Sequence, residues 1–313
     1  MGNRHTIHTV HFEGSSDLVL SALPAGAHDY NYTTIGPDSG GPFQEVEFIQ
    51  ALEERLTFSS EALDSLLDNF SLTQINCIGA GKTYTEMHLY GRRLDPCGVA
   101  GTSAGSTHAQ AKATLARLVF TQLTASGNGT ASLAGYAILL SADGMAEAST
   151  VAYNVALPTG GIVDEAFKLH GVKLGGVTLD DDKITQLTLD TGLRVVPVFG
   201  TKSRPREVSF TKTVPTLTIA SEDTSLVSSF PRSGTIATHA NSLIELRKRD
   251  PTTGGEVATA TTSHIALTVA GTVRPQNISG SGSQVATSGL VATLTGIAGT
   301  PPIAVSTGVA LTL

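Results

Sequence analysis

Tryptophan is absent from this chain of 313 residues, and only 15% of the residues are charged and 5% aromatic. Long apolar segments are lacking too, because no run approaches the roughly 20 residues that a membrane-spanning helix requires. Basic charge is in the minority, with 20 Lys and Arg against 27 Asp and Glu and a net charge of −7. This balance argues against a protein that grips nucleic acid through its phosphates, which needs a basic surface.

Cysteine is scarce as well. The two cysteines are Cys77 and Cys97, and no secretory signal is recognisable ahead of them. Such usage is typical of a reducing compartment and of free thiols rather than a disulfide framework. We therefore expect a soluble protein that is made in a cytoplasm, with no membrane segment.

Glycine, threonine, serine, valine and alanine are abundant, with 33 glycines and a hydrophobic share of 40%. This composition favours many short strands joined by tight turns around a genuine core. We therefore predict an all-β fold with one short helix in each half. The length suits one large β domain or two domains of ordinary size.

An internal repeat decides between these two options. The segments Glu45–Leu67 and Arg206–Phe230 share the same order of residue types, at an offset of 162 residues that becomes 161. The matches are Glu45-Val46 with Glu207-Val208, Phe48 with Phe210, Leu56–Phe58 with Leu217–Ile219, and Ser60-Glu61 with Ser221-Glu222. In the second copy we expect a strand, a turn at Pro215, another strand and a helix opened by Ser221. In the first copy a helix is expected from Ser59 or Ser60 to about Asn69.

The repeat extends further along both halves. A long hairpin is predicted for Ala109–Leu140, around the turn Ser126–Gly129. Thr107–Ala109 resembles Thr238–Ala240, and the closing strands Ser149–Pro158 and Ile303–Thr312 resemble each other. We therefore expect two tandem β-sandwich or barrel domains at 1–158 and 159–313. Residues 72–102 have no evident counterpart in the second half and are expected to be an insertion.

Two short motifs suggest enzymes. Gly79–Thr83 (GAGKT) resembles the end of a phosphate-binding loop, but Asn76 stands where the pattern needs its first glycine. Gly101–Gly105 (GTSAG) matches a nucleophile elbow and resembles that of patatin-like lipases, with Ser103 as nucleophile and Asp143 as its partner. No glycine-rich oxyanion segment precedes Ser103, and the alternating βαβ pattern of a hydrolase is missing. We retain a Ser103 esterase or lipase as an alternative and expect no enzyme activity.

Three histidines near the start of the chain, His5, His8 and His11, recur at every third position. On a strand this spacing alternates between faces, so the three side chains cannot converge on one ion. We expect no metal site and no cofactor.

The second half, Val172–Leu313, resembles the tail tube proteins of long-tailed bacteriophages. One motif is a strand, a proline, a threonine-rich strand and an acidic helix start, here VSFTKTVPTLTIASED at Val208–Asp223. The other is a closing strand of the type Pro-Ile-x-Val-Ser-Thr, here Pro302–Thr307. The first half shares the resemblance through the internal repeat.

The resemblance implies a structural virion protein. Its subunits would stack as rings whose inner sheets line a channel for double-stranded DNA, which passes without specific binding. Three two-domain chains would form a pseudo-hexameric ring, in place of six single-domain chains. The other partners would be the tape measure, tail terminator and baseplate proteins. The protein would be located in the phage tail, which would be assembled in the cytoplasm of a bacterial host.

A channel that carries DNA should be neutral to negative, so that the duplex does not stick to its wall. The candidate acidic residues of the channel are Glu47, Glu53, Glu54, Asp180, Asp181 and Asp182. A basic run of the second half is a candidate contact between rings: Arg247, Lys248 and Arg249. A different β-rich tail component, such as a tail terminator or baseplate protein, is the alternative structural role.

Overall fold

The structure is a computed structural model. It describes residues 4–13, 18–20, 25–35, 48–69, 85–94, 108–156, 162–163, 165–179, 181–230, 237–250, 252–280, 285–296 and 302–313. These ranges contain nineteen strands, two short α-helices and one turn of 3-10 helix. The all-β class that the composition predicts is confirmed.

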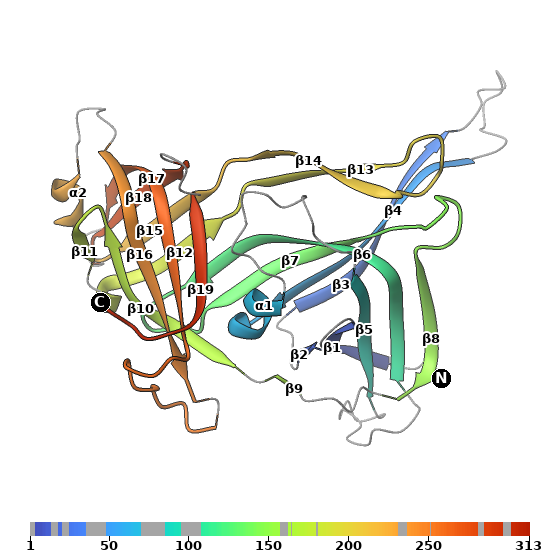
Figure 1. The fold of residues 1–313 in the computed structure, drawn as a ribbon, viewed down its shortest axis with the longest axis horizontal. Helices are drawn as coiled ribbons and strands as arrows, with labels where there is room; N and C mark the ends of the chain where they lie inside the picture. Colours follow the sequence, from blue (N-terminus) through green and yellow to red (C-terminus); the bar gives the residue numbers. More distant parts are fainter. Residues whose placement is uncertain are drawn as a thin grey trace.

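Residues of the first half form one lobe, at the right of Figure 1. The elements of this first lobe are β1 (Arg4–Glu13), β2 (Leu18–Leu20), β3 (Ala25–Ile35), β4 (Phe48–Ser60), α1 (Leu63–Asn69), β5 (Thr85–Leu94), β6 (His108–Ala125), β7 (Ser132–Leu139) and β8 (Ser149–Val155). The short β9 (Ile162–Val163) follows and pairs in parallel with β2.

The second lobe, at the left of Figure 1, is built from the rest of the chain. Its elements are β10 (Ala166–Leu174), β11 (Val177–Leu179), the 3-10 turn η2 (Asp181–Lys183), β12 (Ile184–Asp190), β13 (Leu193–Val198), β14 (Glu207–Thr213), β15 (Thr216–Ser221), α2 (Leu226–Ser229), β16 (Ala237–Arg249), β17 (His264–Ser279), β18 (Thr287–Leu294) and β19 (Ile303–Val309).

The strand pairings of the first lobe recur in the second. In the first lobe β5 lies between β1 and β6, β7 lies between β4 and β6, and β2, β3 and β8 pair with β1, β4 and β6. In the second lobe β16 lies between β10 and β17, β18 lies between β15 and β17, and β11, β12 and β19 pair with β10, β15 and β17. Seven antiparallel pairings thus occur in the same chain order in both lobes.

The residue registers match too. Ser60 stands opposite Leu133 between β4 and β7, and Ser221 stands opposite Ser288 between β15 and β18. Both pairings continue for six positions, so β4 and β15 are related by 161 residues and β7 and β18 by 155. A β-bulge recurs as well, because β1 and β10 each shift register at a histidine, His8 or His170.

The same local turn follows β4 and β15. The Ser60 hydroxyl accepts a hydrogen bond from the Ala62 amide at 3.1 Å, and the Ser221 hydroxyl accepts one from the Asp223 amide at 3.0 Å. In the second lobe the Asp223 carboxylate then accepts bonds from the amide and hydroxyl of Ser225. The helix expected to open at Ser221 therefore begins only at Leu226, because this turn holds the acidic residues before it.

Two of the equivalences that the sequence predicts between the halves are wrong. The pairings make β6 the equivalent of β17, so His108 corresponds to His264 and not to His239. Each of these buried histidines stands opposite the last paired residue of a closing strand, Val155 or Val309. The range 72–102 is not a pure insertion, since it contains β5, the equivalent of β16. A short match such as Thr-His-Ala says nothing about long-range pairing, which decides these equivalences.

Each lobe folds its strands into two layers around apolar side chains. The long strand β6 pairs with β5 and β8 over its first half and with β7 over its second half, and β17 does the same with β16, β19 and β18. Most of the buried apolar residues form one continuous cluster through both lobes, and α1 contributes Leu63, Leu66 and Leu67 to it. Burial of this apolar surface is the main term that stabilises the fold.

Candidate assembly interface

The two lobes are joined edge to edge. Residues 187–190 of β12 pair antiparallel with residues 122–125 of β6, with Leu187 opposite Ala125 and Leu189 opposite Leu123. These four apolar side chains are all buried. One sheet therefore runs through eight strands of both lobes, in the order β3, β4, β7, β6, β12, β15, β18, β17.

Helix α1 forms a second part of the junction. It packs against β19 of the second lobe, as Figure 1 shows. The Ser65 amide and hydroxyl of α1 donate hydrogen bonds of 3.2 and 2.8 Å to the Glu165 carboxylate, which precedes β10. The α1 helix of the first lobe thus contacts the closing strand and the start of the second lobe.

An arm from the second lobe forms the third part. Strands β13 and β14 pair only with each other among the described strands, and Figure 1 shows this β13–β14 arm reaching across β6 and β7 to the first lobe. Val195 and Val208 of the arm pack on Tyr136, Ile138 and neighbouring side chains of the first lobe. The arm continues the β12–β15 pair beyond its far end. Its equivalent in the first lobe is the far end of the β3–β4 hairpin.

Backbone hydrogen bonds fix the tip of the arm. The Leu52 amide donates to the Ser203 carbonyl at 2.8 Å, and the Ser141 amide donates to the Pro205 carbonyl at 2.9 Å. The Arg204 amide donates to the Gly144 carbonyl at 3.0 Å. Three contacts of this kind, one with β4 and two with the loop 141–144, set the position of the arm along the first lobe.

A buried ion pair lies beneath the arm. The Arg204 guanidinium bonds the carboxylate of Glu54, which is 3% exposed, and the same carboxylate accepts a hydrogen bond from the Ser149 hydroxyl. Glu54 therefore has two partners that compensate for its loss of water. Its role is to anchor the arm.

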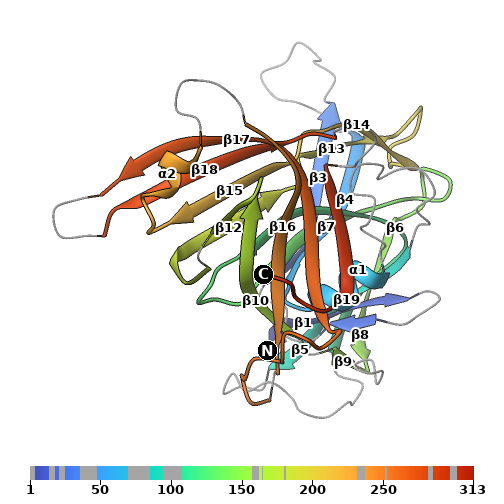
Figure 2. The same cartoon turned by 60° about the vertical axis from the view of Figure 1, so that its left-hand side comes forward.

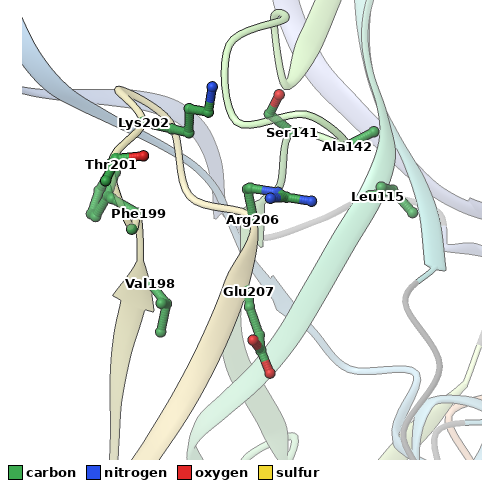
Figure 3. Close-up of a pocket in the computed structure, with 10 residues that line it drawn as sticks. Leu115, Ser141, Ala142, Val198, Phe199, Thr201, Lys202, Arg206 and Glu207 are labelled. Carbon is green, nitrogen blue, oxygen red and sulfur yellow. The ribbon is translucent and has the colours of Figure 1, made fainter.

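An open groove of about 690 Å³ lies beside this junction, between the arm tip and β6 (Figure 3). Leu115 and Ser141 line it from the first lobe, and Lys202, Arg206 and Glu207 line it from the arm. Figure 3 shows the Arg206 guanidinium extending from the arm toward the side of the groove where Leu115 and Ala142 lie. Since both sides of the groove come from the junction, we interpret it as part of the contact between arm and lobe.

The loop opposite the arm is held by Asp143. Its carboxylate accepts hydrogen bonds from the amides of Met145 and Ala146 and from the Ser141 hydroxyl, at 2.7–3.0 Å. These bonds, first of all that of Ala146, lower the Asp143 pKa from 3.8 to about 2. Asp143 is thus engaged within its own loop, while its suggested partner Ser103 and the segment 79–83 lie outside the described residues.

The face of the continuous sheet opposite the core is rich in hydroxyl groups. Ser132, Thr124, Thr188 and Thr218 stand in one row across β7, β6, β12 and β15, and the Thr124 and Ser132 hydroxyls bond at 2.8 Å. A parallel row contains Gln122, Asp190, Thr216, Thr293 and Thr272. This face is not among the features predicted from the sequence, although threonines at alternate positions of the strands are its visible signal.

The structure separates the predicted acidic residues. Glu53 and Glu54 are neighbours on β4 and point to opposite faces; Glu53 lies on the hydroxyl-rich face and pairs with Arg55, whereas Glu54 points inward to Arg204. Glu54 is therefore no exposed residue of a channel wall. Asp182 is exposed in η2, at the start of β12 rather than on the sheet face. Asp181 belongs to the same turn, and Glu47 and Asp180 lie outside the described residues.

Two of the three side chains of the predicted basic contact between rings have partners within the chain. Arg247 bonds the Glu256 carboxylate and the Val257 carbonyl, and Lys248 lies 4.0 Å from the Glu165 carboxylate. Arg249 forms a backbone bridge with Glu256. These contacts join β10, the end of β16 and the following turn, which gives the run a role inside the second lobe.

His5, His8 and His11 all lie on β1. Within the described ranges, no group of three His, Cys, Asp or Glu side chains is placed to hold a metal ion. No helix of the described part is long and apolar enough to cross a membrane. A scan against protein-family models and a search of curated proteins each found no match to this chain.

Proposed function

We propose that this chain is a structural subunit of a long-tailed phage tail tube, which assembles into stacked rings around a channel for double-stranded DNA. The observation that carries the proposal is the β6–β12 pairing, which joins two lobes of the same strand order into one sheet. A unit that already binds its own repeat edge to edge is suited to continue the same contact between chains. The tail tube resemblance of Val208–Asp223 and Pro302–Thr307 gives this assembly its biological setting.

The hydroxyl-rich face supports the channel. If the sheet closes around an axis with this face inward, Thr124, Thr188, Thr216 and Thr218 line the wall. Uncharged hydroxyls release no counterions from DNA, so the duplex would slide past without strong binding. Glu53 would not be a free negative charge of this wall, because it pairs with Arg55 beside Tyr136, which the arm contacts.

In this proposal three chains supply six lobes to each ring, and the rings stack into tubes. Six domains of ordinary radius around a duplex would give an outer diameter of roughly 80–100 Å. The tape measure protein would occupy the channel before DNA does, and the terminator and baseplate proteins would close the two ends. The assembly would take place in the host cytoplasm and persist in the virion.

Negative-stain electron microscopy of the purified protein tests the proposal. We expect hollow rings or tubes whose class averages show six lobes in a three-fold arrangement. Dispersed monomers, in fresh and aged concentrated samples alike, would rule out the tube function. Rings that never stack would instead indicate a tail terminator or baseplate protein. Ester hydrolysis by the parent and not by Ser103→Ala would revive the esterase alternative.

A further inference from the structure

We propose that each copy binds the next through two different surfaces, which repeat between chains the contact that joins the two lobes within one chain. The first surface, the β17–α2 face, contains residues 277–280 at the end of β17, Val285 and helix α2. The second, the β3–β8 face, contains the edge of β3 together with β8. This inference rests on the proposed function insofar as both require the chain to bind copies of itself.

The equivalence of the lobes identifies these surfaces. Within the chain, the first lobe offers β6 and α1, and the second lobe receives them with the β12 edge and β19. The repeated pairings make β17 and α2 the equivalents of β6 and α1, and they make β3 and β8 the equivalents of β12 and β19. The β17–α2 face and the β3–β8 face are therefore the two halves of one contact. They belong to different lobes, so that they would meet between two copies of the chain.

Burial at β17 supports the first half. Leu123 of β6 is 5% exposed, and it stands between Leu133 of β7 and Leu189 of β12. The equivalent residue of β17 is Ile278, which stands opposite Ser288 of β18 and is 52% exposed. In the described part of the chain no strand occupies the place beside Ile278 that β12 occupies beside Leu123.

Burial at β8 supports the second half independently. Val305 of β19, the strand against which α1 packs, is 5% exposed. Its equivalent on β8 is Val151, which is 50% exposed, and the next side chain on that face is the exposed Tyr153. Exposed apolar side chains thus occur on both proposed faces: Tyr30, Val151 and Tyr153 on the one, and Ile278 and Val285 on the other. Apolar side chains that are exposed together on one face mark protein–protein contacts.

The intrachain contact also predicts the register between copies. Asp190 of β12 pairs with Gln122 of β6. The pairing of Asp29 with Arg55 makes Asp29 the equivalent of Asp190, and the pairing of Asn277 with Gly289 makes Asn277 the equivalent of Gln122. Asp29 of one copy should therefore stand opposite Asn277 of the next, with the strands antiparallel.

Because the two faces differ, the contact is head to tail rather than two-fold symmetric. A head-to-tail contact uses one face of each type per copy and closes into a ring when the rotation between copies allows it. Closure would also cover the β3 and β17 edges, which would otherwise be sites for uncontrolled strand pairing.

Disulfide trapping tests the two faces and their register. In a parent with Cys77→Ser and Cys97→Ser, Asp29→Cys chains are mixed with Asn277→Cys chains under mild oxidation. Residues directly opposite in an antiparallel pair have Cα atoms about 4.5–5.5 Å apart, within the range for a disulfide. We expect a covalent dimer in the mixture and none with either variant alone, because like faces do not meet.

The control shifts the register by one residue. Ile278→Cys replaces Asn277→Cys in the mixture, and adjacent strand residues point to opposite faces, so no dimer is expected. Equal trapping of both pairs, or trapping of one variant with itself, would overturn the inference.

A surface variant separates this inference from the proposed function. Ile278→Lys should abolish assembly in sedimentation and leave a folded monomer, whereas Val196→Lys, at a similarly exposed site on the arm, should assemble like the parent. Tubes that form normally with Ile278→Lys would overturn these faces and leave the tube function standing. Register-specific dimers without hollow assemblies under the microscope would uphold the faces and remove the tube function.

Discussion

At the scale of single residues, two carboxylates in adjacent positions have different roles because strand side chains alternate. Glu54 points inward and forms an ion pair with Arg204 beneath the arm, whereas Glu53 lies on the hydroxyl-rich face beside Arg55. Their shared sequence context gave both the same predicted role on a channel wall. The pairing of the arm with the first lobe, which the sequence does not reveal, sets them apart.

Alanine substitutions at these two positions should lower the free energy of unfolding by different amounts. Glu54→Ala leaves the Arg204 guanidinium without its buried partner, which should lower the free energy of unfolding by about 3 kcal/mol. Glu53→Ala removes a partly exposed pair and should cost less than about 1 kcal/mol. Urea unfolding of the two variants measures the difference, and equal losses would contradict the assigned positions.

The Asp143 loop should give a pH dependence. Its pKa falls from 3.8 to about 2 on folding, so its charged form stabilises the fold above pH 4, and this contribution is lost as the pH falls toward 2. Asp143→Asn cannot ionise, and its stability should therefore decline less than that of the parent between pH 4 and pH 2. Urea midpoints across this window measure the effect, with the exposed neighbour Glu147→Gln as the control for loss of one charge. Parallel declines would show that the loop does not hold the carboxylate.

At the scale of elements, one break distinguishes the second lobe from the first. The β3–β4 hairpin pairs over eleven positions with one register shift, whereas Gly192 and Pro215 divide its equivalent into the β12–β15 pair and the β13–β14 arm. Gly192 has a φ of +60°, and a Cβ there would lie 2.1 Å from the Val214 carbonyl oxygen. This bend directs the arm onto the first lobe.

Gly192→Ala should therefore destabilise the chain and loosen the arm. The steric conflict adds to the cost of a left-handed backbone, for a total of about 3 kcal/mol. Gly200→Ala is the matched control, since Gly200 has a φ of +63° with nothing within 4 Å of its Cβ position. It should cost only about 1–2 kcal/mol. Thermal unfolding compares the two variants, and an equal loss would mean that the close approach to Val214 does not constrain the bend.

At the scale of the whole molecule, the chain consists of two lobes with the same pairings and one completed junction. The junction combines the β6–β12 pairing, the packing of α1 on β19 and the arm. Figure 2 shows β12, β15, β18 and β17 side by side, with β17 at the far end of the sheet. The strands of the two lobes pair in the same way. The lobes differ because β12 and β19 cover β6 and α1 of the first lobe, whereas no described strand covers the equivalent end of β17.

Equivalent residues of the two lobes should respond differently to the same truncation. Leu123→Ala opens a cavity in the buried junction and should cost about 2–5 kcal/mol in the unfolding of dilute monomer. Ile278→Ala, at the equivalent but exposed position, should change monomer stability by less than about 0.5 kcal/mol and weaken self-association instead. Urea unfolding and sedimentation are the two measurements. A large loss of monomer stability with Ile278→Ala would show that this end of β17 is already covered within the chain.

The sequence alone determined the all-β class, the helix after each copy of the repeat, the β6–β7 hairpin and the relation of Leu56–Ser60 to Leu217–Ser221. These features depend on local propensity and on apolar residues at alternate positions, which are visible in any single chain. Three further features emerge only from the folded chain: β6 corresponds to β17, Glu54 is buried, and Arg247 and Lys248 have acidic partners inside their own lobe. Those outcomes depend on which distant strands meet, and a strand pattern fixes the faces of a strand but not its neighbours.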